Sequence, residues 1–158
     1  MLFRSGKTDV LTPTDRFAPR DYLNVVGTDF LAVNAARLLY GGATNTLDLV
    51  WSPRFTPSRV PLLNQRWVVL PEGIPIRDLG AQFPGGSQFG ARWNHIGARA
   101  EYALSFYDGF NHLPLIASPS LLSLQRYYPR MRMYGFDAVL PFPSVAIKIG
   151  RASCRERV

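Results

Sequence analysis

The sequence predicts an all-β fold, and more narrowly a fragment of an antiparallel transmembrane β-barrel with about six or seven strands, short periplasmic turns and long external loops. Three observations support this prediction. Apolar and polar residues alternate with a period of two in several stretches, and short turns alternate with long loops along the chain. In addition, no apolar run reaches the roughly 18 residues that a transmembrane helix needs. Large apolar side chains on one face and charged ones on the other are typical of a barrel with lipid outside and water inside.

The clearest alternation lies in residues 88–108, QFGARWNHIGARAEYALSFYD. Phe89 and Trp93 fall on one face there, next to small or polar residues on the other. After a break at 96–99 the same period resumes, with Leu104 again on the apolar face. This pattern predicts two paired strands with one lipid-facing and one water-facing side.

Further strands are predicted on both sides of this hairpin. The same period predicts the end of a strand at 6–11, a hairpin at 33–40 and 46–53, a strand at 130–140 and the start of another at Val145. The connections are short at 41–45, 96–99 and 141–144 and long at 12–31, 54–87 and 109–129. Scattered prolines exclude the long loop at 54–87 from the central sheet, and a short helix is expected at 118–128. Strict alternation of short turns with long loops is the pattern of outer-membrane barrels.

Both ends of the chain resemble translated sequencing adapters. MLFRS at 1–5 and IGRASCRERV at 149–158 match opposite adapter ends, so we expect 6–148 to be the natural, partial barrel and an internal piece of a longer protein. The two ends hold four arginines and one glutamate, a net of +3, which leaves +4 of the total of +7 for 6–148. The high net charge is therefore not taken to indicate a nucleic-acid partner. The only cysteine, Cys154, also lies in the last ten residues, which leaves 6–148 without thiol chemistry.

Charged residues are predicted on the water-facing side of the strands. These lumen-facing candidates are Lys7, Asp9, Arg37, Asp48, Arg92 and Glu101. Arginines opposite carboxylates would screen solutes by charge, and an excess of arginine would favour anionic solutes. The alternative is that these charges pair with one another inside a narrow barrel or face water. In the loops, Arg54, Arg59 and Arg66 are candidates for a constriction or a surface contact, against the alternative of a solvated loop surface.

No feature of the sequence predicts an enzyme, a metal site or a cofactor. The two histidines, His95 and His112, are expected at opposite ends of the barrel, too far apart to share a metal ion. Ser105 is predicted to face the lumen near Glu101, but nucleophilic catalysis would also need a histidine beside it.

Several stretches together resemble a known class of membrane protein. They are GKTDVLTPTDRFAPRDY, LDLVWSPRFTPSRVPLLNQRW, GARWNHIG, LSFYDGFNHLP and YGFDAVLP. Their layout is similar to Gram-negative outer-membrane porin-like barrels, and more narrowly to those related to alginate-export and substrate-selective porins. The resemblance implies a place in the bacterial outer membrane, contact with its lipid and passage of small polar solutes, anionic ones among them; a homo-oligomer stays open. Two alternatives stay open as well: an outer-membrane barrel with a structural or surface-binding role, and a soluble β-sandwich binding module.

Overall fold

The computed structural model describes residues 18–24, 27, 29–62, 76–142 and 145–157, and every regular element in these ranges is a strand. The strands are β1 (Arg20–Asp21), β2 (Asp29–Phe30), β3 (Ala36–Gly41), β4 (Asn45–Ser52), β5 (Arg77–Gln82), β6 (Gln88–Ile96), β7 (Glu101–Phe110), β8 (Leu115–Ser120), β9 (Ser123–Tyr127), β10 (Arg130–Pro141) and β11 (Ala146–Arg157). Within the same ranges, no helix is long and apolar enough to cross a membrane.

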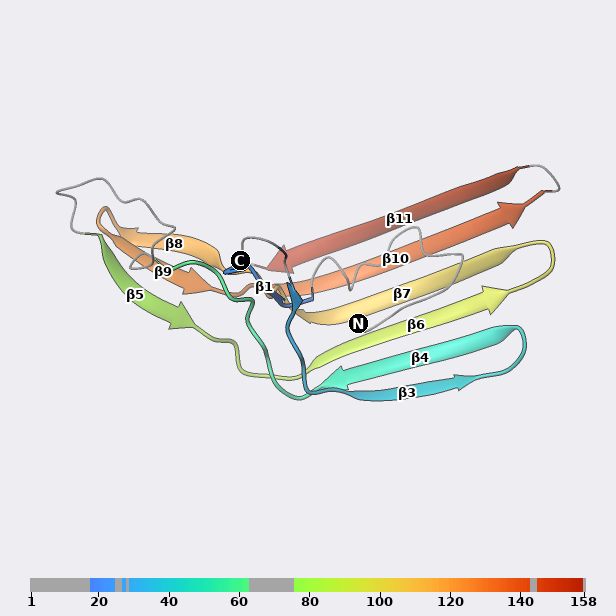
Figure 1. The fold of residues 1–158 in the computed structure, drawn as a ribbon, viewed down its shortest axis with the longest axis horizontal. Coiled ribbons are helices and arrows are strands. Elements are labelled where there is room, and N and C mark those ends of the chain that lie inside the picture. The colour runs from blue at the N-terminus through green and yellow to red at the C-terminus, as the bar shows by residue number, and fades with distance from the viewer. Residues whose placement is uncertain (1–17, 25–26, 28, 63–75, 143–144, 158) are drawn as a thin grey trace.

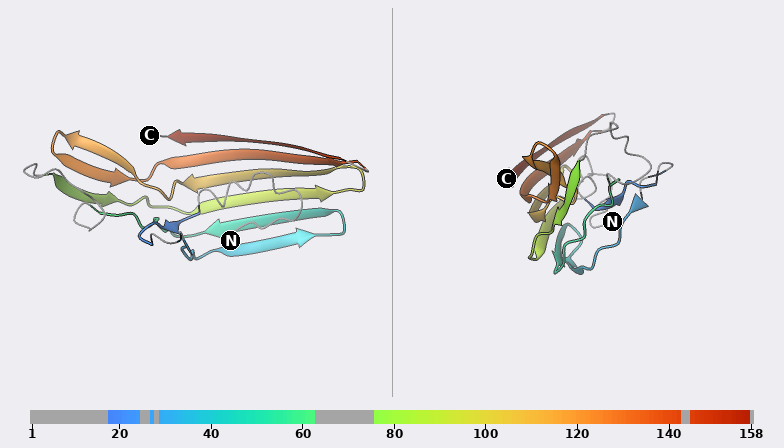
Figure 2. Two further views of the ribbon diagram at one scale, coloured as in Figure 1. Left: turned by 45° about the horizontal axis from the view of Figure 1, so that its top comes forward. Right: turned by 90° about the vertical axis from the view of Figure 1, so that its left-hand side faces the viewer.

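Six of the strands form one long open sheet in the order β11-β10-β7-β6-β4-β3 (Figure 1). Every neighbouring pair in this sheet is antiparallel. The predicted all-β, antiparallel architecture is therefore confirmed. The sheet is not closed into a barrel: β3 and β11 form its two edges (Figure 2). A two-stranded sheet (β1-β2) and a three-stranded sheet (β5-β9-β8) complete the fold.

The connections of the long sheet differ between its two ends. The turns β3–β4, β6–β7 and β10–β11 are short and lie at one end of the strands (Figure 1). The connections β4–β6 and β7–β10 are long and lie at the other end, which we call the loop end. Gly41 closes the first turn, because a side chain there would collide with the backbone of Asn45 and Thr46.

The long connections contain a small sheet that was not predicted from the sequence. In it, β5 pairs with β9 in parallel and β8 pairs with β9 antiparallel. The β5–β9 register shifts between Asp78 and Ala81, where Gly80 has a φ of 87°. Such a left-handed backbone favours glycine.

The prediction of a helix at 118–128 is wrong, because this stretch forms most of the β8–β9 hairpin. Ser118 donates its hydroxyl to the carbonyl of Ser120 at 2.7 Å, and Ser123 Oγ accepts the Ser120 N–H at 3.1 Å. Serine side chains that bond nearby backbone groups in this way compete with helical hydrogen bonds. Leu121 is fully exposed at the turn between β8 and β9.

The residues that resemble adapter translations are only partly described. Residues 1–5 lie outside the described ranges, as does the strand end expected at 6–11. The last ten residues fall mostly on β11, which stays in register with β10 from Pro141↔Ala146 to Arg130↔Arg157. This pairing uses backbone groups, so it places few demands on side-chain identity.

Aromatic side chains pack together at the loop end. Phe55 stacks on the His112 ring at 5.2 Å between centroids and meets the Tyr128 ring at 4.8 Å. His112 is buried, and its Nδ1 lies 2.6 Å from the Thr56 carbonyl oxygen, to which it donates as the Nδ1–H form. Burial lowers the pKa of His112 below its ordinary value of 6.5, and the Thr56 carbonyl partly opposes this shift.

The lowered pKa of His112 makes stability depend on pH. The unfolded chain binds a proton at His112 more readily than the folded chain, so protonation favours unfolding. The part of the free energy of unfolding that depends on a neutral His112 is therefore fully present above pH 6.5. It is lost as the pH falls from 6.5 toward the folded pKa. We expect the urea midpoint to fall between about pH 7.5 and about pH 5, and the His112→Gln variant to show a smaller fall. An equal pH dependence in both proteins would contradict this role of His112.

Candidate functional site

The long sheet buries polar side chains among apolar ones such as Met131, Met133 and Val139 on one face, and it exposes large apolar side chains on the other. Polar side chains that are at most 9% exposed lie on its inner face: Asp48, Ser52, Gln88, Arg92 and Asp137. Large apolar side chains that are 36–57% exposed lie on its outer face: Leu47, Trp51, Phe89, Trp93, Leu104, Tyr134, Phe136 and Leu140. Strand alternation places the two sets on opposite sides.

The first ion pair of the inner face joins β3 to β4. Arg37 donates Nε to Asp48 Oδ1 at 2.8 Å and Nη2 to Asp48 Oδ2 at 2.6 Å, which is a bidentate geometry. The Asp48 side chain is 6% exposed, whereas that of Arg37 is 46% exposed. Solvent therefore screens this pair from one side.

The second ion pair spans three strands. Arg92 on β6 donates Nη2 to Asp137 Oδ2 on β10 at 3.3 Å, and both side chains are 2% exposed. Its Nε donates to Asn94 Oδ1 at 2.8 Å. In register, Arg92 lies opposite Ser105 on β7, and Ser105 lies opposite Gly135 on β10. These small residues leave room for the arginine to reach across β7.

A hydrogen-bonded group ends the inner face at the loop end. The Tyr107 hydroxyl donates to Gln88 Oε1 at 2.6 Å, and the Phe110 N–H donates to the same oxygen at 3.4 Å. Gly109 allows this arrangement, because a Cβ there would lie 2.9 Å from Gln88 Oε1 and would collide with the Tyr107 ring. The Gln88 amide thus ties the start of β6 to the end of β7.

Four of the six lumen-facing candidates lie on one face of the sheet. The pairing register of β3, β4, β6 and β7 places these four on the inner face: Arg37, Asp48, Arg92 and Glu101. Glu101 is half-buried, and no ion pair with another described residue involves it. The other two candidates, Lys7 and Asp9, lie outside the described residues.

Asp137 was not among the residues selected from the sequence. The signal for it was present, because Asp137 has the opposite strand parity to the apolar residues Tyr134, Phe136 and Ala138 in the strand predicted at 130–140. Opposite parity alone would have placed its carboxylate on the inner face.

The two candidate loop arginines that the structure describes, Arg54 and Arg59, have different surroundings. Arg59 Nη1 pairs with Asp21 Oδ2 at 3.1 Å and holds the N-terminal segment against the connection after β4. Arg54 is exposed and, with Phe55 and Phe83, lines a shallow hollow at the loop end. Arg66 lies outside the described residues.

The groups with potential for chemistry are dispersed. His95 lies at the turn end of β6, stacked on Tyr102 at 4.7 Å, while His112 lies beyond the loop end of β7. Ser105 faces Arg92 in register, between the two histidines along the strands. Over the described part of the chain, no three histidine, cysteine or acidic residues gather as metal ligands.

Comparisons with protein families, with curated proteins and with solved structures found no match for this chain.

The Arg92–Asp137 pair should dominate the stability of the inner face. Asp137→Asn leaves the Arg92 charge buried, and we expect it to lower the free energy of unfolding by about 3–5 kcal/mol. Arg59→Gln should lower it by about 1 kcal/mol or less, because the Arg59 and Asp21 side chains are 64% and 21% exposed. Urea unfolding in detergent micelles, followed by tryptophan fluorescence, measures both.

The double variant Arg92→Met with Asp137→Leu is the control for this prediction. It removes both charges together, so it should be more stable than Asp137→Asn. Equal losses for Asp137→Asn and Arg59→Gln would contradict the assignment.

Proposed function

We propose that the long sheet is part of an outer-membrane, porin-like β-barrel that lets small polar solutes pass, anionic ones among them. The observation that supports this proposal is that Asp48, Arg92 and Asp137 are buried on one face while large apolar residues are exposed on the other. Lipid outside and a polar interior would satisfy both faces.

The outer face forms a continuous apolar band. Leu47, Trp93, Leu104 and Phe136 are aligned across β4, β6, β7 and β10 in one row of the register. Leu49 and Trp51 lie on the same face, one and two rows nearer the loop end. A band that crosses four strands matches a lipid contact better than the isolated apolar residues that are common on soluble proteins.

Strand lengths and aromatic positions agree with the proposal. The strands β6, β7 and β10 have 9, 10 and 12 residues, and a tilted strand crosses a bilayer with about 9–11. Trp93 and Tyr102 lie toward the turn end, with ring centroids 5.5 Å apart, and Trp51 lies toward the loop end. Aromatic rings at both ends suit the two interfaces of a membrane.

A membrane location would require partners for the two sheet edges. The open edges of β3 and β11 would leave backbone groups without hydrogen bonds in hydrocarbon, which costs several kcal/mol for each group. We therefore propose that further strands close the barrel beyond β3 and β11.

A structural barrel without transport is the second candidate, and the ion pairs favour it. Arg37 pairs with Asp48 and Arg92 with Asp137, so the inner face has few uncompensated charges to direct solutes.

In a soluble β-sandwich, a second sheet would instead cover the apolar face.

Placing a charge on the outer face separates a membrane sheet from a soluble one. Leu104 is 47% exposed, so Leu104→Arg in water should change the free energy of unfolding by no more than about 0.5 kcal/mol. In a bilayer, the same change should cost about 2–4 kcal/mol and reduce integration into phosphatidylcholine vesicles. Flotation of the chain with the vesicles measures integration.

Leu113→Arg is the matched control, because Leu113 is similarly exposed but lies beyond the loop end of β7. It should float like the native chain. If Leu104→Arg floats equally well, the outer face does not contact lipid.

Conductance distinguishes transport from a structural role. We expect the complete protein that contains this segment to form ion-conducting pores in planar bilayers. Neutralising the inner face with Arg92→Met and Asp137→Leu should change the ratio of anion to cation permeability. Stable insertion without conductance would favour the structural barrel.

A further inference from the structure

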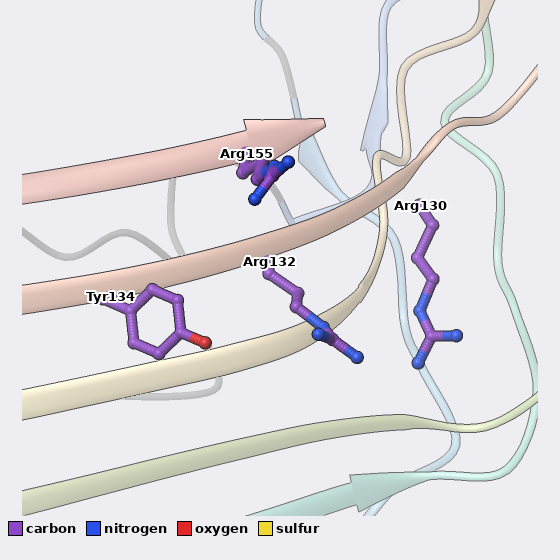
Figure 3. Close-up of a pocket in the computed structure, with 4 residues that line it drawn as sticks. All are labelled: Arg130, Arg132, Tyr134 and Arg155. Carbon is purple, nitrogen blue, oxygen red and sulfur yellow. The ribbon is translucent and has the colours of Figure 1, made fainter. Parts of the chain in front are cut away.

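A group of arginines surrounds a small hollow on the outer face at the loop end. Arg130, Arg132 and Tyr134 follow one another along this side of β10, and Arg155 lies beside them on β11 (Figure 3). The hollow has a volume of about 110 Å³. The side chains of Arg130 and Arg132 are 54% and 45% exposed, so both reach solvent.

A carboxylate on the neighbouring strand positions two of these arginines. Asp108 on β7 accepts Arg130 Nε at Oδ1 (2.9 Å) and Arg132 Nε at Oδ2 (2.8 Å). Each contact uses one edge of a guanidinium. The terminal nitrogens of Arg130 and Arg132 make no hydrogen bond with any described residue. They remain available as donors to an anion, for which the guanidinium geometry is suited.

The arginines continue directly into the apolar band. On β10, Tyr134 follows Arg132 on the same face, and Phe136 and Leu140 follow in turn. The Tyr134 ring contacts Phe106 of β7, with centroids 5.3 Å apart. Two residues of a strand span about 7 Å, so the cationic group and the apolar band adjoin each other.

We propose that Arg130 and Arg132 bind the phosphate of a membrane lipid whose acyl chains lie against the apolar band. This inference rests on the proposed membrane location and names a specific lipid contact within it. With Asp108 the pair carries a net charge of +1, which suits a phosphate group. Arg155 adds a further positive charge in this chain, but it lies in the stretch that resembles an adapter, so the assignment depends on Arg130 and Arg132.

A lipid accounts for the surroundings better than a nucleic acid does. Arg126, Tyr127, Tyr128, Arg130 and Arg132 interleave cations with aromatic rings in the sequence, as a surface that binds single strands would. In the fold, Arg126 pairs with Asp78 at 3.2 Å, and Tyr128 is buried. Tyr134, which is 57% exposed, lies beside the arginines and leads into the apolar band.

The test compares flotation with two kinds of vesicle. One kind is pure dioleoylphosphatidylcholine, and the other also contains dioleoylphosphatidic acid. The native chain should prefer the acidic vesicles. Arg130→Gln with Arg132→Gln should reduce this preference by about fivefold for each arginine removed, with flotation on the neutral vesicles unchanged.

Arg77→Gln with Arg99→Gln is the matched control. It removes two exposed arginines from β5 and from the β6–β7 turn, so the net charge falls equally. This control should keep most of the preference. An equal loss in both double variants would show that net charge acts without a site, and it would overturn the proposal. Far-ultraviolet circular dichroism verifies that every variant keeps its strands.

Two further outcomes distinguish the ligand and the premise. If Arg130→Gln with Arg132→Gln loses the binding of inorganic phosphate but keeps the full preference for acidic vesicles, the site binds phosphate alone and the lipid assignment is wrong. If the native chain fails to float even with the neutral vesicles, the proposed membrane location fails, independently of the arginines. Flotation on neutral vesicles without a preference for acidic ones would overturn the lipid site alone.

Discussion

The hydrogen-bonded register of the long sheet holds Leu47, Trp93, Leu104 and Phe136 in one row across four strands. The adjacent row on the other face holds Asp48, opposite Arg92. A slip of one residue in any strand would exchange the faces of that strand. It would then bury a tryptophan or phenylalanine among charges and expose a carboxylate beside apolar rings. Both the ion pairs and the apolar band therefore depend on this register.

The Arg92–Asp137 pair shows how costly the inner face is to build. Moving two charges out of water costs several kcal/mol for each ion, and their mutual attraction offsets this cost only with good geometry. The Asn94 amide accepts from Arg92 Nε, and the small residues Ser105 and Gly135 leave the path across β7 open. A fold that needed only stability would gain from apolar residues here.

The sequence allowed the long sheet to be predicted, because its strands carry a clean period of two. The hairpin expected at 33–40 and 46–53 is β3 and β4, at Ala36–Gly41 and Asn45–Ser52, and the strand expected at 130–140 is Arg130–Pro141. The small sheet could not be predicted in this way. Its strands β5, β8 and β9 have only five or six residues, and the parallel partner of β5 lies more than forty residues away. In so short a stretch, leucines such as Leu121 and Leu124 fit a helix as well as a strand.

The candidate site could be predicted in part. Parity alone placed Arg37, Asp48, Arg92 and Glu101 on one face, since strand alternation is a local property. Which charges meet is not local. Arg92 lies directly opposite Asp48 in register, yet Asp48 takes its bidentate contact from Arg37, and Arg92 reaches over β7 to Asp137. These choices depend on the strand order and on the small residues Ser105 of β7 and Gly135 of β10.

The uneven connections of the long sheet also set the entropy of its assembly. The pairs that close the three short turns, such as Gly41↔Thr46 and Ile96↔Glu101, are five positions apart. The first pair between β4 and β6, Ser52↔Gln88, is 36 positions apart. Since each doubling of a loop adds about 0.6 kcal/mol, joining β4 to β6 costs about 2 kcal/mol more in chain entropy than closing a hairpin. Chain entropy therefore opposes the formation of the three hairpins only weakly. It opposes the β4–β6 and β7–β10 pairings more strongly, and the side-chain contacts between those strands must offset this larger loss.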